Sequence, residues 1–166
     1  PIHRAIMAGL KETGVTTFSL EQVIDTGNIL LQRTTDIDPH ENTGSLHDRL
    51  ADLGKSLIVQ TLDTLVAGNL AGVPQNQVGS TKAVLEAPKL FKSDCEIDWN
   101  LPCQTILDHI RGLAPFPKAW CSSPWGDLKI LDAKGYNNLD LISLAGNSIA
   151  HQNKLIVACQ DGWIEI

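Results

Sequence analysis

The segment SLHDRLADLGKSLIVQTLDTLV, residues 45–66, decides the fold class of the first half of the chain. Its apolar residues recur every three or four positions, as on one face of an α-helix: Leu46, Leu50, Leu53, Leu57, Ile58, Leu62, Leu65 and Val66. Ser45 with Asp48 three residues later resembles a capping box, and Gly68-Asn69 is a suitable stop. We therefore predict a helix of about 20 residues, packed on a sheet.

The residues before this helix predict one short helix and two strands. Pro1 suits a first helical position, and the apolar pattern up to Met7 continues that helix. Residues 15–20 and 29–31 are expected to be strands of a buried sheet, with a tight loop at residues 25–28 between them. This combination indicates an α/β fold.

The second half of the chain has a different pattern. Residues 71–97 lose the helical periodicity and have the composition of a linker. A helix is expected at residues 101–113, where the Ala-Pro-Phe-Pro sequence ends it. Period-two alternation then predicts short strands at residues 128–131, 139–142, 155–158 and 163–164, as in a small antiparallel β-barrel. The predicted division is therefore 1–70, a linker at 71–97, and 98–166.

Composition narrows the function classes. The chain has 166 residues and a formal net charge of −6, which argues against an extensive basic surface for nucleic acid; any RNA contact has to come from local geometry or from residues outside this chain. Four cysteines without a Cys-x-x-Cys pair predict reduced thiols and no metal: Cys95, Cys103, Cys121 and Cys159. No apolar run approaches the roughly 18 residues of a membrane span, so we expect a cytoplasmic protein.

Five segments, in order and spacing, resemble the methionyl-tRNA formyltransferase family. Three are similar to the latter half of its Rossmann-like catalytic domain, and two are similar to its linker and the start of its OB-like barrel: PIHRAI at 1–6, KETGVT at 11–16, IDTGNIL at 24–30, APKL with IDW at 87–99, and IRGLAPFPKAW at 110–120. The resemblance implies an N-terminal part of the catalytic domain before Pro1 and further barrel strands after Ile166.

Three other interpretations remain open at this point. Asp-Thr-Gly at residues 25–27 also marks aspartic proteases, but those need β-rich lobes, which the helix at 45–66 does not fit. Sugar-nucleotide formyltransferases and the hydrolase part of formyltetrahydrofolate dehydrogenase share the fold, although the IDTG and IDW sequences favour the tRNA enzyme. A noncatalytic module that binds RNA or a protein partner is the alternative from a different class.

The resemblance implies transfer of a formyl group from 10-formyltetrahydrofolate to the amino group of methionyl initiator tRNA, without a metal or a membrane partner. The family places an asparagine, a histidine and an aspartate around the reacting carbonyl, and Asp25 matches the aspartate. The other two are expected before Pro1, so this chain alone should be inactive. The resemblance also assigns Ile24, Thr26 and Gly27 to one wall of the folate pocket, and Lys89 and Lys92 to tRNA phosphates.

The chemistry gives Asp25 a role that can be stated without the family. An amine that attacks a formyl group must lose a proton while an oxyanion is stabilised. A rigidly held carboxylate can then orient a protonated imidazole or relay the proton through water. The structural alternative is that the Asp25 side chain only caps its turn.

Overall fold

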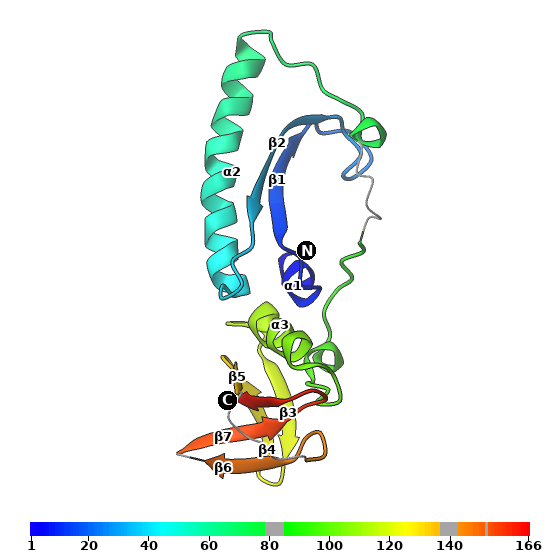
Figure 1. Ribbon diagram of the computed structural model, residues 1–166. Coiled ribbons are helices and arrows are strands. Elements are labelled where there is room, and N and C mark those ends of the chain that lie inside the picture. The colour runs from blue at the N-terminus through cyan, green and yellow to red at the C-terminus, as the bar shows by residue number, and fades with distance from the viewer. Residues whose placement is uncertain (79–84, 137–142, 152) are drawn as a thin grey trace. The chain divides into compact units, whose positions relative to one another are not determined.

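The computed structural model describes residues 1–78, 85–136, 143–151 and 153–166, and its contacts group the chain into two compact units (Figure 1). The first unit combines Pro1–Leu10, Asp38–Ser45 and Ala87–Ile166, and the second combines Lys11–Ile37 and Leu46–Glu86. Contacts therefore place the N-terminal residues with the C-terminal half. The predicted division at residues 70 and 97 rests on periodicity and composition and not on contacts, so it stays a prediction.

The second unit consists of a β-hairpin and a long helix. Strands β1 (Glu12–Phe18) and β2 (Ile29–Asp36) pair antiparallel, with Glu12 opposite Asp36. Helix α2 (Thr43–Val66) runs alongside them (Figure 1), and the Thr17 and Thr61 hydroxyl oxygens lie 2.9 Å apart. No residue of β1 or β2 is fully buried. The prediction of a buried sheet was wrong here: β1 and β2 form a two-stranded sheet, extended among the described residues only by an isolated bridge between Ile29 and Val73, and its side chains are at most half-buried.

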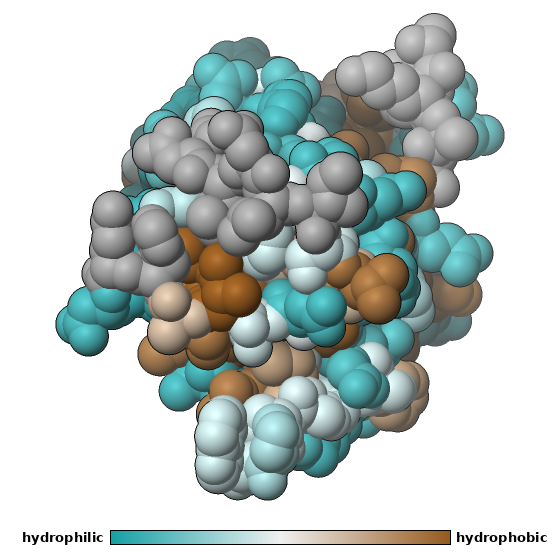
Figure 2. All heavy atoms as spheres, turned by 60° about the horizontal axis from the view of Figure 1, so that its bottom comes forward, coloured by the Kyte–Doolittle hydropathy of each residue, from teal (hydrophilic) through white to brown (hydrophobic). Residues whose placement is uncertain are grey.

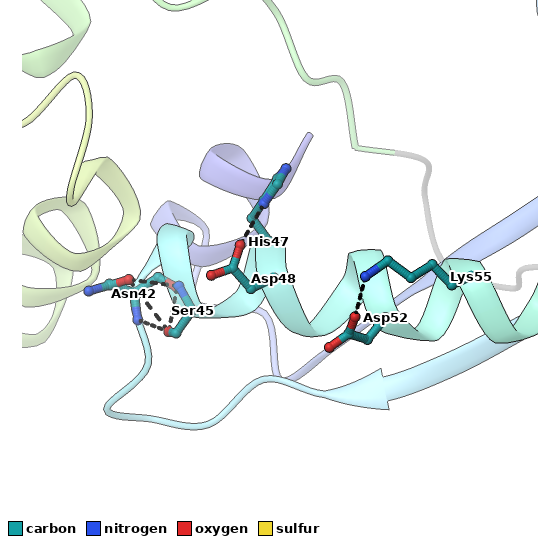
Figure 3. Close-up of polar contacts among 6 residues, drawn as sticks. All are labelled: Asn42, Ser45, His47, Asp48, Asp52 and Lys55. Atoms are coloured by element: carbon teal, nitrogen blue, oxygen red, sulfur yellow. Dashed lines mark hydrogen bonds and ion pairs between the residues drawn. The ribbon is translucent and has the colours of Figure 1, made fainter.

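Helix α2 begins two residues before Ser45, the residue that the sequence suggested as its cap (Figure 3). Asn42 Oδ1 accepts a hydrogen bond from the Ser45 backbone N–H at 3.0 Å, and Ser45 Oγ accepts one from the Asn42 N–H at 3.1 Å. The reciprocal pair is therefore Asn42 with Ser45, one turn earlier than predicted. Asp48 contacts the His47 ring at 3.1 Å instead.

The end of α2 is the one that the sequence predicted. The Gly68 N–H donates to Leu65 O at 3.0 Å and the Asn69 N–H donates to Thr64 O at 3.1 Å, which together form a Schellman motif. Gly68 has a φ of +71°, in the left-handed region that glycine adopts without steric cost.

The apolar face of α2 is only partly covered. Leu46, Leu50 and Leu57 are buried, as the helical periodicity predicts. Farther along the helix the same apolar pattern continues on exposed side chains: Ile58, Val59, Leu62, Leu65 and Val66. The periodicity thus predicted the helix correctly but not the extent to which its face is buried.

In the first unit, the short helix α1 (Ile2–Met7) packs on α3 (Cys103–Leu113). The contact is close because Gly112 has no side chain: a Cβ there would lie 2.6 Å from Met7 Cγ and 3.1 Å from Met7 N. The Gly112 carbonyl also accepts hydrogen bonds from His3 Nδ1 at 2.8 Å and from Thr43 Oγ1 at 2.6 Å. Gly112 therefore joins three segments that are far apart in the sequence.

Six further strands form two antiparallel sheets: β3 (Ala119–Ser123) with β4 (Gly126–Ile130), and β5 (Lys134–Tyr136), β8 (Trp163–Glu165), β7 (Lys154–Ala158) and β6 (Ser148–His151) in that spatial order. The predicted strands at 128–131, 155–158 and 163–164 are confirmed as β4, β7 and β8. The prediction for 139–142 lies outside the described residues, and β3, β5 and β6 were missed. On the face seen in Figure 2, apolar side chains are scattered among hydrophilic ones.

The core of this unit lies between α3 and the strands. Its buried members come from α3, from the strands and from the segments next to them: Cys95, Ile97, Ile106, Ile110, Leu113, Ala119, Ile130, Cys159 and Ile164. Ile106, Ile110 and Leu113 repeat at helical spacing, so they lie on one face of the helix predicted at 101–113.

A buried ion pair fastens α3 to the segment before α2. Arg111 Nε lies 2.8 Å from Asp108 Oδ1, and the two side chains are only 12% and 8% exposed. Gln104 Nε2 donates to the same carboxylate oxygen at 3.0 Å. Arg111 also donates to the carbonyls of Glu41 at 3.1 Å and Asp38 at 3.4 Å. The Arg111 guanidinium of this pair therefore holds the backbone of residues 38 and 41 against α3.

Replacing Asp108 should destabilise the protein strongly. Asp108→Ala leaves the Arg111 guanidinium buried without its carboxylate, which costs about 3–5 kcal/mol of unfolding free energy. Asp108→Asn keeps one acceptor and should lose less. Asp52→Ala is the matched control, because Asp52 pairs with Lys55 at an exposed site and should leave the urea midpoint unchanged. Equal midpoints for Asp108→Ala and Asp52→Ala would contradict this role.

Candidate functional site

The loop between β1 and β2 contains four of the predicted site residues. Its ends are joined by a hydrogen bond from the Ser19 N–H to Asn28 O at 2.9 Å. Thr26 Oγ1 donates to Val23 O at 2.9 Å. From outside the loop, Gln75 Nε2 donates to Asp25 O at 2.7 Å and to Gly27 O at 2.9 Å. The backbone around Asp25 is thus held by a distant glutamine as well as by its own turn.

Gly27 is required by the packing of this loop. It is buried, and a Cβ at this position would lie 1.6 Å from Ser19 O and 2.6 Å from Ser19 C. Both atoms belong to the backbone, so no side-chain rotation could relieve the overlap. Packing alone therefore requires glycine at this position of the Asp-Thr-Gly sequence, whether or not Gly27 also contacts a ligand.

Asp25 itself is exposed and has a φ of +59°, a left-handed conformation that aspartate tolerates better than most residues. Within the described part of the chain its carboxylate has no hydrogen-bonding partner, so it does not cap the turn. The expectation of a carboxylate held rigidly at the entry to a buried strand was also wrong, because β2 is not buried. The structure therefore removes the capping explanation and leaves the predicted catalytic role untested.

The Asp25 carboxylate stands among exposed apolar side chains of the same loop. Leu20 is 92% exposed and Ile24 is 85% exposed, and Val23 is exposed too. A carboxylate next to an uncovered apolar surface can serve one side of a site that binds a flat, largely apolar ring and activates an amine. Ile24, Thr26 and Gly27 belong to the same loop, and their assignment to a folate pocket stays a prediction.

The two predicted tRNA-binding residues, Lys89 and Lys92, lie in the first unit and line a cleft of about 680 Å³. Five basic side chains and one acidic side chain line it: Arg4, Lys89, Lys92, Lys118, Lys129 and Asp127. Lys92 Nζ is paired with Asp127 Oδ2 at 3.0 Å, and the other cations leave the cleft locally positive although the chain carries a net charge of −6. Clustered cations of this kind are what phosphate groups require.

Aromatic rings accompany the lysines in the cleft. Lys92 Nζ lies 4.8 Å from the centroid of the Trp120 ring, and Lys89 Nζ lies 5.8 Å from that of Phe91. Trp120 Nε1 also donates to Lys92 O at 2.9 Å. Phe116, which is 77% exposed, completes the set. Cations beside uncovered rings can contact both phosphates and unpaired bases.

Arg4 fixes the wall of the cleft that carries Lys89. Its Nε donates to Pro88 O at 3.3 Å, and its guanidinium lies 3.4 Å from Asp94 Oδ2. Cys95 follows in the same wall, where burial raises the pKa of its thiol, with a smaller contribution from the Asp94 charge. A neutral thiol therefore lies behind the cationic surface.

Sequence reasoning missed six cationic or aromatic members of this cleft: Arg4, Phe91, Phe116, Lys118, Trp120 and Lys129. Four of them lie in segments already recognised as similar to the family, PIHRAI and IRGLAPFPKAW, so closer attention to charged and aromatic residues in those segments could have found them. Lys129 is different, because only the β3–β4 pairing brings it beside Trp120, its register partner.

Two other expectations concern metal and membrane. The structure brings together the thiols of Cys103 and Cys159 with the Asp161 carboxylate, three donor groups within 4.8 Å of one another. The spacing of the cysteines had not suggested such a cluster. Among the described helices, none combines the length and apolar character needed to cross a bilayer.

Comparison with known families accounts for most of the chain. Residues 1–62 match the family model described as formyl transferase, and residues 89–166 match the one described as formyl transferase, C-terminal domain. The chain therefore belongs to the formyltransferase family, with an α/β fold as predicted.

Several curated relatives carry a more specific name. A methionyl-tRNA formyltransferase of Bacteroides fragilis is 36% identical over 171 residues, which cover all of this chain and 53% of that protein. The enzyme of the same name from Parvibaculum lavamentivorans is 41% identical, with the same shares covered. One from Porphyromonas gingivalis is 44% identical over 72% of this chain and 37% of its own length. The chain thus spans about half the length of these relatives.

Solved structures support the fold. HypX from Aquifex aeolicus in complex with tetrahydrofolic acid superposes with a TM-score of 0.75 at 19% identity, covering 99% of this chain and 28% of HypX. An N-formyltransferase from Helicobacter canadensis, in complex with folinic acid and dTDP-3-aminofucose, gives 0.71 at 18% identity, covering 97% and 57%. At these identities the likeness shows a shared fold.

A pair of glycine substitutions tests the geometry of the Asp25 loop. Gly27→Ala should lower the unfolding free energy by about 2 kcal/mol or more, because its Cβ meets backbone. Gly54→Ala is the control: it lies within α2 with nothing within 4 Å of the new Cβ, so better helix propensity should raise stability by about 0.5–1 kcal/mol. Chemical denaturation of both variants measures the difference. A Gly27→Ala protein as stable as the parent would show that the loop is built differently.

Proposed function

We propose that this chain works as part of a methionyl-tRNA formyltransferase, which transfers a formyl group from 10-formyltetrahydrofolate to the amino group of methionyl initiator tRNA in translation initiation. The similarity to relatives of that name, 36–41% identical across the whole chain, carries the proposal. The chain spans about half the length of these relatives, and the proposal assigns the rest of the catalytic set to residues outside it. A cytoplasmic location belongs to the same proposal.

Asp25 is the proposed catalytic carboxylate of this chain. The attacking amine loses a proton as the tetrahedral oxyanion forms, and a carboxylate can stabilise the imidazolium that accepts the proton or pass it to water. The free carboxylate of Asp25 is compatible with this role, because its oxygens are not engaged by other described residues. The asparagine and histidine of the site are proposed to come from residues before Pro1.

The folate donor is proposed to lie against the loop of Asp25. The exposed Ile24 side chain and the backbone of Thr26 and Gly27 can form one wall for the flat pteridine ring, next to the carboxylate. The buried Gly27 keeps the backbone close-packed there. The second wall would again come from residues outside this chain, so the 166-residue chain alone should bind folate weakly and should not turn over.

The cleft of the first unit is the proposed contact for tRNA. Its lysines supply phosphate contacts, and Phe116 and Trp120 supply faces on which unpaired nucleotides can stack. Binding through such a small cationic patch should be weak and strongly dependent on salt. Salt-independent submicromolar binding of tRNA to this chain would rule out the electrostatic mechanism.

The competing function is formyl transfer to an amino-sugar nucleotide. The structural neighbour from Helicobacter canadensis, solved with dTDP-3-aminofucose, is the observation that keeps this alternative open. The decisive assay gives the complete enzyme two amine acceptors, methionyl-tRNA and an amino-sugar nucleotide, with the same formyl donor. Transfer to the sugar alone would overturn the proposal. Transfer to neither, together with retained tRNA binding, would favour the noncatalytic module.

Asp25→Asn in the complete enzyme should separate chemistry from folding. Asparagine keeps the size of the side chain and removes its charge, so we expect turnover to fall about 10²–10⁴-fold, in the range of acid-base and electrostatic contributions. Stability should change little, because no described residue binds this carboxylate. Single-turnover formyl transfer and a thermal melt of the same sample measure the two effects. Turnover at the parent rate would end the catalytic assignment.

Lys89→Ala and Lys92→Ala should each weaken tRNA binding across all tRNA sequences. If each lysine neutralises one phosphate, the slope of log K against log salt should fall by about 1 per substitution. Lys55→Ala removes an exposed lysine of α2, outside the cleft, and should leave the slope unchanged. The measurement is a fluorescence titration at several salt concentrations. Identical slopes for all three variants would remove the cleft from the interface.

A further inference from the structure

Two of the four cysteines, 56 positions apart in the sequence, meet in the first unit. Cys103 Sγ and Cys159 Sγ lie 2.7 Å apart, closer than two sulfur atoms in simple van der Waals contact. Cys103 is the first residue of α3, and Cys159 directly follows β7. The structure thus brings together two thiols that the proposed formyl transfer does not use.

The surroundings hold both cysteines in place. Asp161 Oδ1 accepts a hydrogen bond from the Cys103 backbone N–H at 2.6 Å, which ties the start of α3 to the turn between β7 and β8. On the other side of that turn, the Cys159 N–H donates to Gly162 O at 2.9 Å. A Cβ at Gly162 would lie 3.4 Å from Cys103 Sγ, an ordinary contact distance, so this residue borders the thiol without crowding it. Both cysteine backbones are therefore anchored independently of any sulfur bond.

We infer that Cys103 and Cys159 form a site of oxidative modification, at which a small disulfide converts the two thiols into an intrachain disulfide bond. Cys103, the half-buried member of the pair, attacks the reagent, forms a mixed disulfide and releases one small thiol. Cys159 then attacks Cys103 Sγ, the protein disulfide forms, and the second small thiol leaves. The two electrons and both thiol protons of the protein pass to the reagent, which becomes two thiols.

The chemistry of the site also predicts its rate. Burial raises the pKa of the Cys103 thiol, and the hydrogen bond with Cys159 raises it further. Because the attacking species is the thiolate, the reaction should be slow at neutral pH and accelerate as the pH rises. Once formed, the bond closes a long loop of chain, which restricts the unfolded state and favours the folded one.

A thiophilic metal ion is the other use of this cluster, with Asp161 as third ligand. Zinc holds its thiolates at about 2.3 Å in a tetrahedral arrangement, which separates the two sulfur atoms by well over 3 Å. The observed pair is closer than that, and one oxygen of Asp161 is already bound to the α3 backbone. The geometry therefore favours sulfur-to-sulfur bonding over a shared metal.

The test treats the purified 166-residue chain with oxidised glutathione at mildly alkaline pH and then alkylates the remaining thiols. The reduced chain has four free thiols; after oxidation we expect two, and a covalent link between tryptic peptides 93–111 and 155–166. The link should be absent from Cys103→Ser and Cys159→Ser and should persist in Cys121→Ser, the matched control on β3. The linked chain should melt higher by on the order of 10 °C.

Three results would overturn the inference. One is four alkylated thiols, or stable glutathione adducts without a peptide link, in a folded chain after prolonged oxidation. Another is stoichiometric zinc that co-purifies with the reduced chain and is lost in Cys103→Ser, which would make the cluster a metal site. Because peptide 93–111 also contains Cys95, a link that survives in Cys103→Ser would assign the partner of Cys159 to Cys95 and likewise refute the pair.

Discussion

The close approach of α1 to α3 at Gly112 is the contact on which the first unit depends. With any side chain at this position, a carbon atom would overlap Met7, including its backbone nitrogen. The same glycine carbonyl accepts hydrogen bonds from His3 and Thr43, residues 109 and 69 positions away in the sequence. Arg111, directly before it, binds the carbonyls of residues 38 and 41. One turn of α3 therefore assembles three distant segments.

This assembly is what makes the cleft. Arg4 reaches the backbone of Pro88 because α1 is held on α3, and residues 87–95 are in turn kept beside β3 by the Trp120 contact with Lys92. The cationic surface is therefore a product of packing and not of composition. A chain that is acidic overall can present a local positive surface, since phosphate responds to charge within about a Debye length, roughly 8–10 Å in physiological salt.

The second unit shows a different relation between structure and function. The backbone of the Asp25 loop is fixed by the packing of Gly27 and by the Gln75 side chain. The Asp25 side chain and the apolar side chains of the same loop are exposed. A carboxylate in this setting acquires its reactivity from whatever lies against it, because burial and neighbouring charges set its proton affinity.

The sequence by itself determined the local features: the three helices, the Gly68 stop, and the strands that begin near residues 29, 155 and 163. These follow from periodicity and turn chemistry, which act over a few residues. The family was also accessible from the sequence, but through the resemblance of five segments and not through periodicity. The Asn42 cap of α2 is also local, since its partner Ser45 is three residues away. Tertiary structure alone decided that β1 and β2 are not buried, that the Asp25 carboxylate has no partner among the described residues, and that Cys103 meets Cys159. Each of these depends on residues distant in the sequence, whose proximity is set by the packing of whole elements and leaves no local pattern from which it could be predicted.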